Sequence, residues 1–191
     1  MPSLYDWFMK PLEKRGIRTA RKRLMKLVKG SVLEIGSGTG ANIPFYNMDE
    51  IDQLVITDKK LSKHIDVYRE LEKVELVETS VTSLPYKDQS FDTIVHTLVF
   101  CSVDDVMKGL SELKRVLKPG GKLMFIEHVL PHKKGYRRLF KTINPIWRTF
   151  AGGCNLTRSY EESLITSGFQ IEQVNRFMST VFISGIATKK T

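Results

Sequence analysis

Several features that would assign this protein to a class at once are missing from its 191-residue sequence. It has no apolar run of about 18 residues, so we expect no transmembrane helix. Its first ten residues, MPSLYDWFMK, lack the basic start and apolar core of a signal peptide. Cysteine occurs only at Cys101 and Cys154, far apart and without metal-ligand spacing. These absences predict a cytoplasmic protein with reduced thiols and no metal site.

Acidic residues are scarce in two segments of a chain whose net charge is +9. Residues 10–29 hold nine Lys or Arg and one acid, Glu13. Residues 128–160 hold seven Lys or Arg and no acid. Two interpretations remain open: a surface for nucleic acid or an anionic membrane, or a solvated basic face.

The most informative stretch that is present is SVLEIGSGTG, residues 31–40. We expect residues 31–35 to form a buried strand that runs into a glycine turn. The three glycines alternate, which differs from the spacing of a dinucleotide fingerprint, and no lysine follows as in a P-loop. Glu34 before the turn would repel phosphate but suits a cationic ligand. The stretch resembles motif I of class I S-adenosylmethionine-dependent methyltransferases; a plain tight turn is the alternative.

The rest of the chain alternates between strand and helix patterns, as expected of one α/β domain over residues 1–191. A catalytic core over residues 31–188 would follow an N-terminal helical lid over residues 1–29. Further strands are predicted at 53–58, 74–78, 91–97 and 122–129, and an antiparallel pair at 169–176 and 180–188. Helices are predicted at 41–46, 61–71, 104–117 and 157–167; in residues 135–150, Pro145 should interrupt the helical pattern.

The N-terminal segment allows two interpretations. It is either an amphipathic lid over the cofactor cleft that also touches lipid, or a helix packed on the sheet with a solvated basic back. Leu4, Trp7, Phe8 and Leu12 fall at helical spacing, and the lid is favoured for residues 4–8. The packed helix is favoured for the second stripe, from Ile17 to Val28, with Arg18, Arg21, Lys22 and Lys26 on its solvated side.

An acid ends the second predicted strand. Asp58 lies 18 residues after Gly40, where a carboxylate in nucleoside-binding α/β folds accepts hydrogen bonds from ribose hydroxyls. The alternative is an N-cap for the helix that follows.

The order of motifs along the chain resembles the type 11 class I methyltransferases. The motifs are LEIGSGTG, VITD, SLPYKDQSFDTIV, LKRVLKPGGKLMFIEHV and SYEESLITSGF. The resemblance implies a Rossmann-like seven-stranded sheet, mostly parallel with an antiparallel C-terminal hairpin, and helices on both faces. TLVFCSV, EHV and NPIWRTFAGGCNLTR resemble the methyltransferase-like thiol methyltransferases and their bacterial phospholipid-methyltransferase-like relatives. The chain departs from the animal members in lacking a hydrophobic N-terminal anchor.

The resemblance also assigns residues to S-adenosylmethionine. The methionine end would be held by Glu34, Gly36, Ser37, Gly38 and Gly40. Asp58 would hold the ribose. Lys59 would lie near the adenine, which Ser80, Val81 and Thr82 would line. Thr97 and Leu98 would lie close to the sulfonium, and Tyr5 would close over the cofactor. In the family pattern an acid reads the adenine, and neither Ser80 nor Thr82 is acidic.

The predicted function is methyl transfer to a small molecule, best a thiol or another small lipophilic nucleophile. His128 is the candidate base and His96 the second, with Trp147, Cys154 and Asn155 as candidates for the acceptor pocket. The alternative is a phosphatidylethanolamine-type headgroup methyltransferase in peripheral contact with an anionic membrane. Nucleic acid is not expected, because residues 97–100 lack the acidic-polar-proline-aromatic tetrad of amino methylation. The sequence leaves the oligomeric state open.

Overall fold

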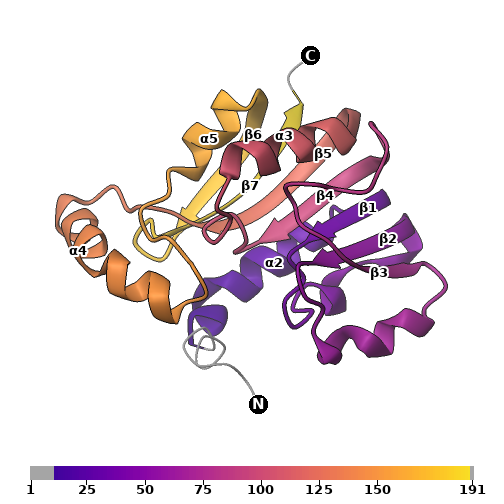
Figure 1. Ribbon diagram of the computed structural model, residues 1–191, viewed down its shortest axis with the longest axis horizontal. Helices are drawn as coiled ribbons and strands as arrows, with labels where there is room; N and C mark the ends of the chain where they lie inside the picture. Colours follow the sequence, from indigo (N-terminus) through magenta and orange to yellow (C-terminus); the bar gives the residue numbers. More distant parts are fainter. Residues whose placement is uncertain (1–10, 190–191) are drawn as a thin grey trace.

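The computed structural model describes residues 11–189, and its centre is one seven-stranded sheet (Figure 1). The strand order is β3-β2-β1-β4-β5-β7-β6. The strands are β1 (Gly30–Ile35), β2 (Ile51–Asp58), β3 (Val74–Glu78), β4 (Phe91–Thr97), β5 (Leu117–His128), β6 (Phe169–Phe177) and β7 (Phe182–Lys189).

The sheet is parallel except at its C-terminal end. β7 runs antiparallel to β5, with Phe125 opposite Gly185, and β6 runs antiparallel to β7. β1 pairs with β2 on one side and β4 on the other, both in parallel register. The chain therefore reverses its direction of winding beside β1, and in open α/β sheets ligands bind at such a point, at the carboxyl ends of the strands. The predicted fold class is confirmed.

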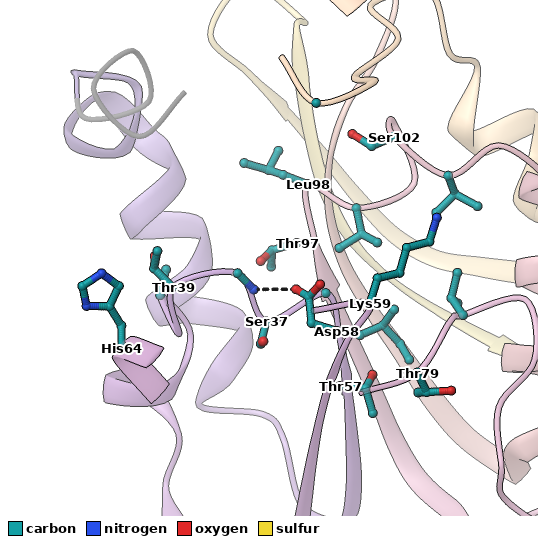
Figure 2. A pocket seen from close by; sticks show the side chains of 18 of the residues that line it. Ser37, Thr39, Thr57, Asp58, Lys59, His64, Thr79, Thr97, Leu98 and Ser102 are labelled. Atoms are coloured by element: carbon teal, nitrogen blue, oxygen red, sulfur yellow. Dashed lines mark hydrogen bonds between the residues drawn. The ribbon is translucent and has the colours of Figure 1, made fainter. Parts of the chain in front are cut away.

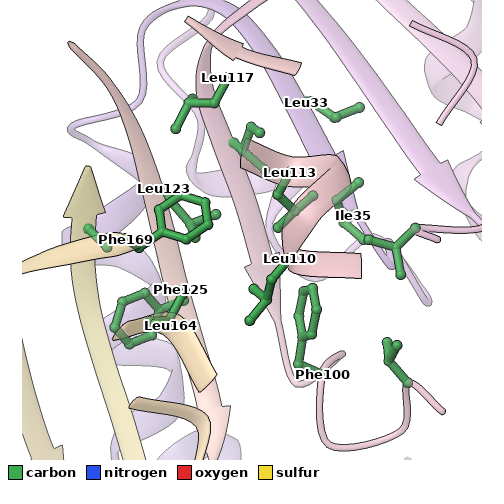
Figure 3. Packing of buried hydrophobic residues seen from close by; sticks show 14 of the residues in the cluster. Leu33, Ile35, Phe100, Leu110, Leu113, Leu117, Leu123, Phe125, Leu164 and Phe169 are labelled. Atoms are coloured by element: carbon green, nitrogen blue, oxygen red, sulfur yellow. The ribbon is translucent and has the colours of Figure 1, made fainter. Parts of the chain in front are cut away.

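Helices cover both faces of the sheet (Figure 1). α3 (Val106–Val116) and α5 (Tyr160–Thr166) pack on one face, where Leu110, Leu113 and Leu164 meet Leu123 and Phe125 (Figure 3). α2 (Arg18–Met25) packs on the other, with η2 (Ile43–Phe45) and η4 (Lys63–Glu70). Alternate strand residues serve the two cores, because strand side chains point to opposite faces.

Two predicted helices on the second face are wrong. Residues 41–46 form only the short 3₁₀ turn η2, with Pro44 at its start, and residues 61–71 form the 3₁₀ segment η4. Within η4 only Ile65 is fully buried. Isolated helical turns gain most of their stability from packing, so one anchoring side chain does not support a longer α-helix. η3 (Met48–Glu50) is a further 3₁₀ turn before β2.

Two boundaries also differ from the sequence patterns. β5 begins at Leu117, directly after α3, so the KPGG segment lies inside the strand rather than between elements. α4 (Lys134–Phe150) continues through Pro145 as one helix. Proline removes the bond to the carbonyl of residue 141, but Lys141 is exposed, so water can satisfy that carbonyl. No side chain of α4 is fully buried.

Candidate functional site

A cavity of about 870 Å³ opens at the carboxyl ends of β1, β2 and β4. Figure 2 shows side chains from all three strand ends facing it. The predicted cofactor residues that line it are Gly36, Ser37, Gly38, Asp58, Lys59, Val81, Thr97 and Leu98. Four segments that lie far apart in the sequence therefore meet in one cleft, which we call the cofactor cleft.

The glycine turn after β1 forms the floor of the cofactor cleft. The amides of Gly36 and Ser37 both donate to the Thr57 carbonyl, which ties the turn to β2. Gly36 has a φ of +69°, and a Cβ there would lie 2.4 Å from Val99 Cγ2. Gly38 has a φ of +52°, but a Cβ there would meet nothing within 4 Å. Gly36 is thus required for packing, whereas Gly38 presents bare backbone to open space.

Asp58 lies at the end of β2 with its carboxylate in the cofactor cleft (Figure 2). One carboxylate oxygen accepts from the Gly38 amide at 2.9 Å and the other from the Lys60 amide at 3.3 Å. Each oxygen has a further lone pair, so two ligand hydroxyls can still be accepted.

A smaller cavity of about 200 Å³ adjoins the cleft beside Lys59. Ser80, Val81 and Thr82 line it, and the Ser80 and Thr82 hydroxyls lie 2.9 Å apart. The three predicted adenine residues are therefore together, with hydroxyls where the family pattern has an acid.

Glu34 is buried beneath the glycine turn and does not line the cofactor cleft. Its two oxygens accept from Asn42 Nδ2 at 2.7 Å and from the Tyr46 hydroxyl at 2.8 Å. Burial raises its pKa, and the bonds from Tyr46 and Asn42 and the charge of Arg21 oppose that rise. Direct contact with a ligand is not supported; the carboxylate instead fixes Asn42. Gly40 is also outside the lining, because its position packs against Ile65.

Arg21 is a cleft residue that the sequence interpretation placed on the wet face of its helix. It is buried, lines the cofactor cleft, and bonds Asn42, Thr97 at 2.8 Å and Glu13 at 2.7 Å. Its spacing was a usable signal, because Arg21 lies four residues after Ile17 and three before Leu24, on the buried face.

Two residues that line the cleft each have a buried polar atom without a hydrogen-bond partner in the described part of the chain. These atoms are Nε of Arg21 and the hydroxyl of Ser37. Buried polar groups are normally satisfied, so each of these donors has the capacity for one more partner near the glycine turn.

A second cavity, of about 260 Å³, lies on the far side of Leu98, which lines both cavities. We call it the apolar cavity. It is lined by Leu12, Leu98, Cys101, His128, Phe140, Ile143, Trp147, Cys154, Leu156, Met178, Val181 and Phe182. Leu98 has a φ of +60°, unusual for a branched residue, and its amide donates to the Ile126 carbonyl. Such strain is typical of positions held by function.

His128 forms part of this apolar wall. Its ring stacks on Phe140 with centroids 5.6 Å apart, and neither ring nitrogen has a hydrogen-bond partner among residues 11–189. Burial lowers the pKa of His128 to about 4. The imidazole is therefore neutral near pH 7, and it is a poor match for a thiol proton with a pKa of about 8.5. The structure thus argues against the predicted role as general base.

His96, the second candidate, has a structural environment. It is fully buried, with Nδ1 2.9 Å from Glu127 and Nε2 2.6 Å from the Tyr160 hydroxyl. Glu127 also accepts from the amides of the loop between the two cavities, Val99, Phe100 and Cys101. This network holds the loop that separates the cavities and leaves His96 without access to either.

The two cysteines both line the apolar cavity, although they lie 53 residues apart in the chain and share no motif. Both are free thiols. The Cys101 thiol hydrogen-bonds to Cys154, which raises the pKa of Cys101 and lowers the pKa of Cys154. Trp147 and Cys154 line the apolar cavity as expected. Asn155 does not; its side chain accepts from Thr157 instead.

Comparisons with known proteins agree with this architecture. A family model described as a methyltransferase domain matches residues 33–125. Thiol S-methyltransferase TMT1B of Homo sapiens is 32% identical over 180 residues, 87% of this chain and 74% of the relative. The chain belongs to the S-adenosylmethionine-dependent methyltransferases.

One further relative supports the family, and one solved structure supports the fold. Human thiol S-methyltransferase TMT1A is 36% identical over 147 residues, 74% of this chain and 60% of its own. An S-adenosylmethionine-dependent methyltransferase from Mesorhizobium loti superposes with a TM-score of 0.69 at 20% identity, over 90% of this chain and 96% of its own. The enzyme class and its cofactor are thereby established at the level of the family.

Four residues of the predicted lid lie outside the part of the chain that the structure describes. Tyr5, Leu4, Trp7 and Phe8 lie in residues 1–10, which are not described. Within residues 11–189, no helix has the length and apolar character needed to span a bilayer. The same residues contain no cluster of His, Cys, Asp or Glu suited to a metal ion.

Proposed function

We propose that this methyltransferase methylates the sulfur of small lipophilic thiols. The observation that carries the proposal is the apolar cavity of about 260 Å³, which shares Leu98 with the cofactor cleft. Its lining is almost wholly apolar or aromatic, so it favours a ligand that leaves water readily. The names of its human relatives, thiol S-methyltransferases TMT1A and TMT1B, support sulfur as the acceptor.

The cofactor cleft suits S-adenosylmethionine at both ends. We propose that Arg21 and Ser37, with their unpartnered polar atoms, bind the carboxylate of its methionine part over the backbone of Gly38. Asp58 binds the ribose hydroxyls, and Lys59, Ser80, Val81 and Thr82 surround the adenine. Glu34 acts indirectly, through Asn42 and Arg21.

When bound, the cofactor supplies a methyl group on a positively charged sulfur. This chain supplies position and desolvation. Leu98 lines both cavities and Thr97 lines the cofactor cleft beside it, so we expect an acceptor in the apolar cavity to approach the cofactor next to Leu98. The acceptor attacks as a thiolate, because a thiol is a weak nucleophile.

His128 has a binding role in this proposal. A neutral imidazole has one ring nitrogen that accepts from a thiol S–H and one N–H that donates to a thiolate, so His128 can orient the sulfur before and after ionisation. Because no residue of the apolar cavity is matched to remove the proton, we expect the rate to follow the ionisation of the acceptor itself.

The N-terminal segment is proposed as a lid. Leu12 lines the apolar cavity and Glu13 the cofactor cleft, so residues just after the undescribed part of the chain already border both. This supports a covering role for the N-terminal segment. The pairing of two free thiols in the acceptor cavity also favours a reducing, cytoplasmic location.

Methyl transfer from labelled S-adenosylmethionine tests the proposal. Hexanethiol and hexanol are offered in parallel, with phosphatidylethanolamine vesicles in a third reaction. We expect label in the methyl thioether and none in the alcohol or lipid. Label in phosphatidylethanolamine alone would reject the thiol proposal in favour of headgroup methylation.

A further inference from the structure

The outer face of α4 carries an unusual concentration of exposed apolar side chains. Leu139 is 51% exposed, Ile146 67% and Phe150 68%, and Tyr136 and Ile143 are also exposed. The positions recur at intervals of three and four residues, so they form one stripe along the helix. In Figure 1, α4 lies beside the sheet rather than over either face. The stripe therefore faces outward, where water would meet it.

Elsewhere in residues 11–189, the exposed large apolar residues are spread over different elements. They are Leu27, Val67, Leu71, Met107, Ile165 and Val174. Scattered apolar residues are normal on protein surfaces and need no partner. A continuous stripe on one helix indicates an interaction surface.

The polar side of α4 identifies the partner's charge. The helix contains Lys134, Arg137, Arg138, Lys141 and Arg148, and no acidic residue. All five of these side chains are exposed, and exposed Lys133 precedes the helix. An apolar stripe on a helix whose charged residues are all cationic is the pattern of a helix that lies in the interface of an anionic membrane.

The inner side of α4 closes the apolar cavity. Phe140 and Trp147 line that cavity together with Ile143, which lies at the border between this side and the exposed stripe, and the Leu156 amide donates to Asn144 at 2.7 Å. The helix is thus a wall between the acceptor cavity and the outside. A lipophilic acceptor that leaves a bilayer beneath α4 would have a short path to the cavity.

We propose that α4 is a docking helix for anionic lipid surfaces, with its apolar stripe in the acyl boundary and its Lys and Arg among the headgroups. Lipophilic acceptors then reach the apolar cavity from the membrane past this helix. The entry of acceptors past α4 rests on the proposed function, whereas the docking of α4 on lipid does not.

Vesicle flotation tests the docking without any methyl transfer. The full chain is mixed with vesicles of phosphatidylcholine alone, or of phosphatidylcholine and phosphatidylserine in a ratio of seven to three. The test variant is Ile146→Glu with Phe150→Glu, since neither residue lines a cavity. The matched control is Val67→Glu, because Val67 is 69% exposed on η4.

We expect the wild type and Val67→Glu to float with the phosphatidylserine vesicles and to be released by high salt. The double variant should lose at least tenfold in vesicle affinity. It should also keep its turnover of a water-soluble thiol, and lose turnover of a thiol presented in vesicles. Equal binding by the double variant would overturn the proposal. So would a dimer of the wild type that the double variant disrupts, because a second copy would then cover the stripe.

Discussion

Recognition of the amino-acid end of the cofactor should depend on Arg21. We expect Arg21→Met to lower the affinity for S-adenosylhomocysteine by about 10- to 100-fold, which corresponds to the loss of a charge-assisted hydrogen bond. Binding of 5′-methylthioadenosine should stay within twofold, because that ligand lacks the carboxylate. Calorimetry with both ligands measures the difference.

Lys22→Met is the matched control, because Lys22 neighbours Arg21 on α2 and is exposed. It should bind both ligands as the wild type does. An equal loss of both ligands in Arg21→Met would make Arg21 a structural residue and contradict its assignment to the carboxylate.

His128 should make the stability of the protein depend on pH. Its pKa is lowered from 6.5 to about 4 by burial, so below pH 6.5 the unfolded chain binds the proton first. Stability due to this group is therefore lost as pH falls from 6.5 towards 4. Between pH 7.5 and pH 5 we expect a loss of about 2 kcal/mol.

Urea unfolding at the two pH values checks this, with His128→Phe as the test variant. Phenylalanine keeps a ring against Phe140 but does not titrate, so its pH dependence should be weaker by that amount. His64→Gln, at an exposed position, should behave as the wild type. Identical pH dependence in the wild type and His128→Phe would show that His128 titrates normally.

Single residues also show where sequence-based prediction ends. Asp58 lines the cleft, as its distance from the glycine turn predicts, and its binding of the ribose stays a prediction. The role of Glu34 was not predictable in this way, since its partners Asn42 and Tyr46 depend on how the chain folds back beneath the turn. The environment of His128 depends on Phe140 and Phe182, from two elements that sequence periodicity does not bring together.

The glycine turn after β1 contains one glycine that packing requires, Gly36, and one that borders the cofactor cleft, Gly38. Gly36→Ala should lower stability by more than 2 kcal/mol, because its Cβ would overlap Val99 in addition to the cost of positive φ. Gly38→Ala should cost only about 1–2 kcal/mol, since nothing lies within 4 Å.

Gly38→Ala should nevertheless lose S-adenosylhomocysteine binding by at least tenfold, because its methyl group projects into the cofactor cleft. Thermal unfolding and calorimetry on both variants separate the two effects. Full cofactor affinity in Gly38→Ala would contradict the placement of the ligand over this backbone.

At the scale of elements, the strands were easier to predict than the helices. Buried parallel strands are short apolar runs, and the predicted strands at 74–78 and 91–97 match β3 and β4. Helix predictions failed where packing is sparse, as in η2 and η4, and where Pro145 lies on an exposed helix. These outcomes depend on tertiary contacts and solvent access, which local patterns do not contain.

In the whole molecule, the sheet brings two chemically different cavities to one edge. The cofactor cleft, which is lined by both polar and apolar side chains, and the apolar cavity share Leu98, which precedes the loop held by Glu127. The motifs predicted the cleft, because its residues lie in recognisable order along the chain. The apolar cavity was only partly predicted, because its walls come from Leu12, α4 and the turn before β7, regions without a shared pattern.

In the proposed function, a thiol occupies the apolar cavity and receives the methyl group from a cofactor on the other side of Leu98. The most direct test measures hexanethiol methylation in Val181→Phe, since Val181 lines that cavity alone and is only partly buried. Val174→Phe, on β6 and outside both cavities, is the control. We predict a KM for hexanethiol raised at least tenfold in Val181→Phe, with unchanged affinity for S-adenosylhomocysteine. Unchanged thiol kinetics in a variant that still binds cofactor would contradict the account.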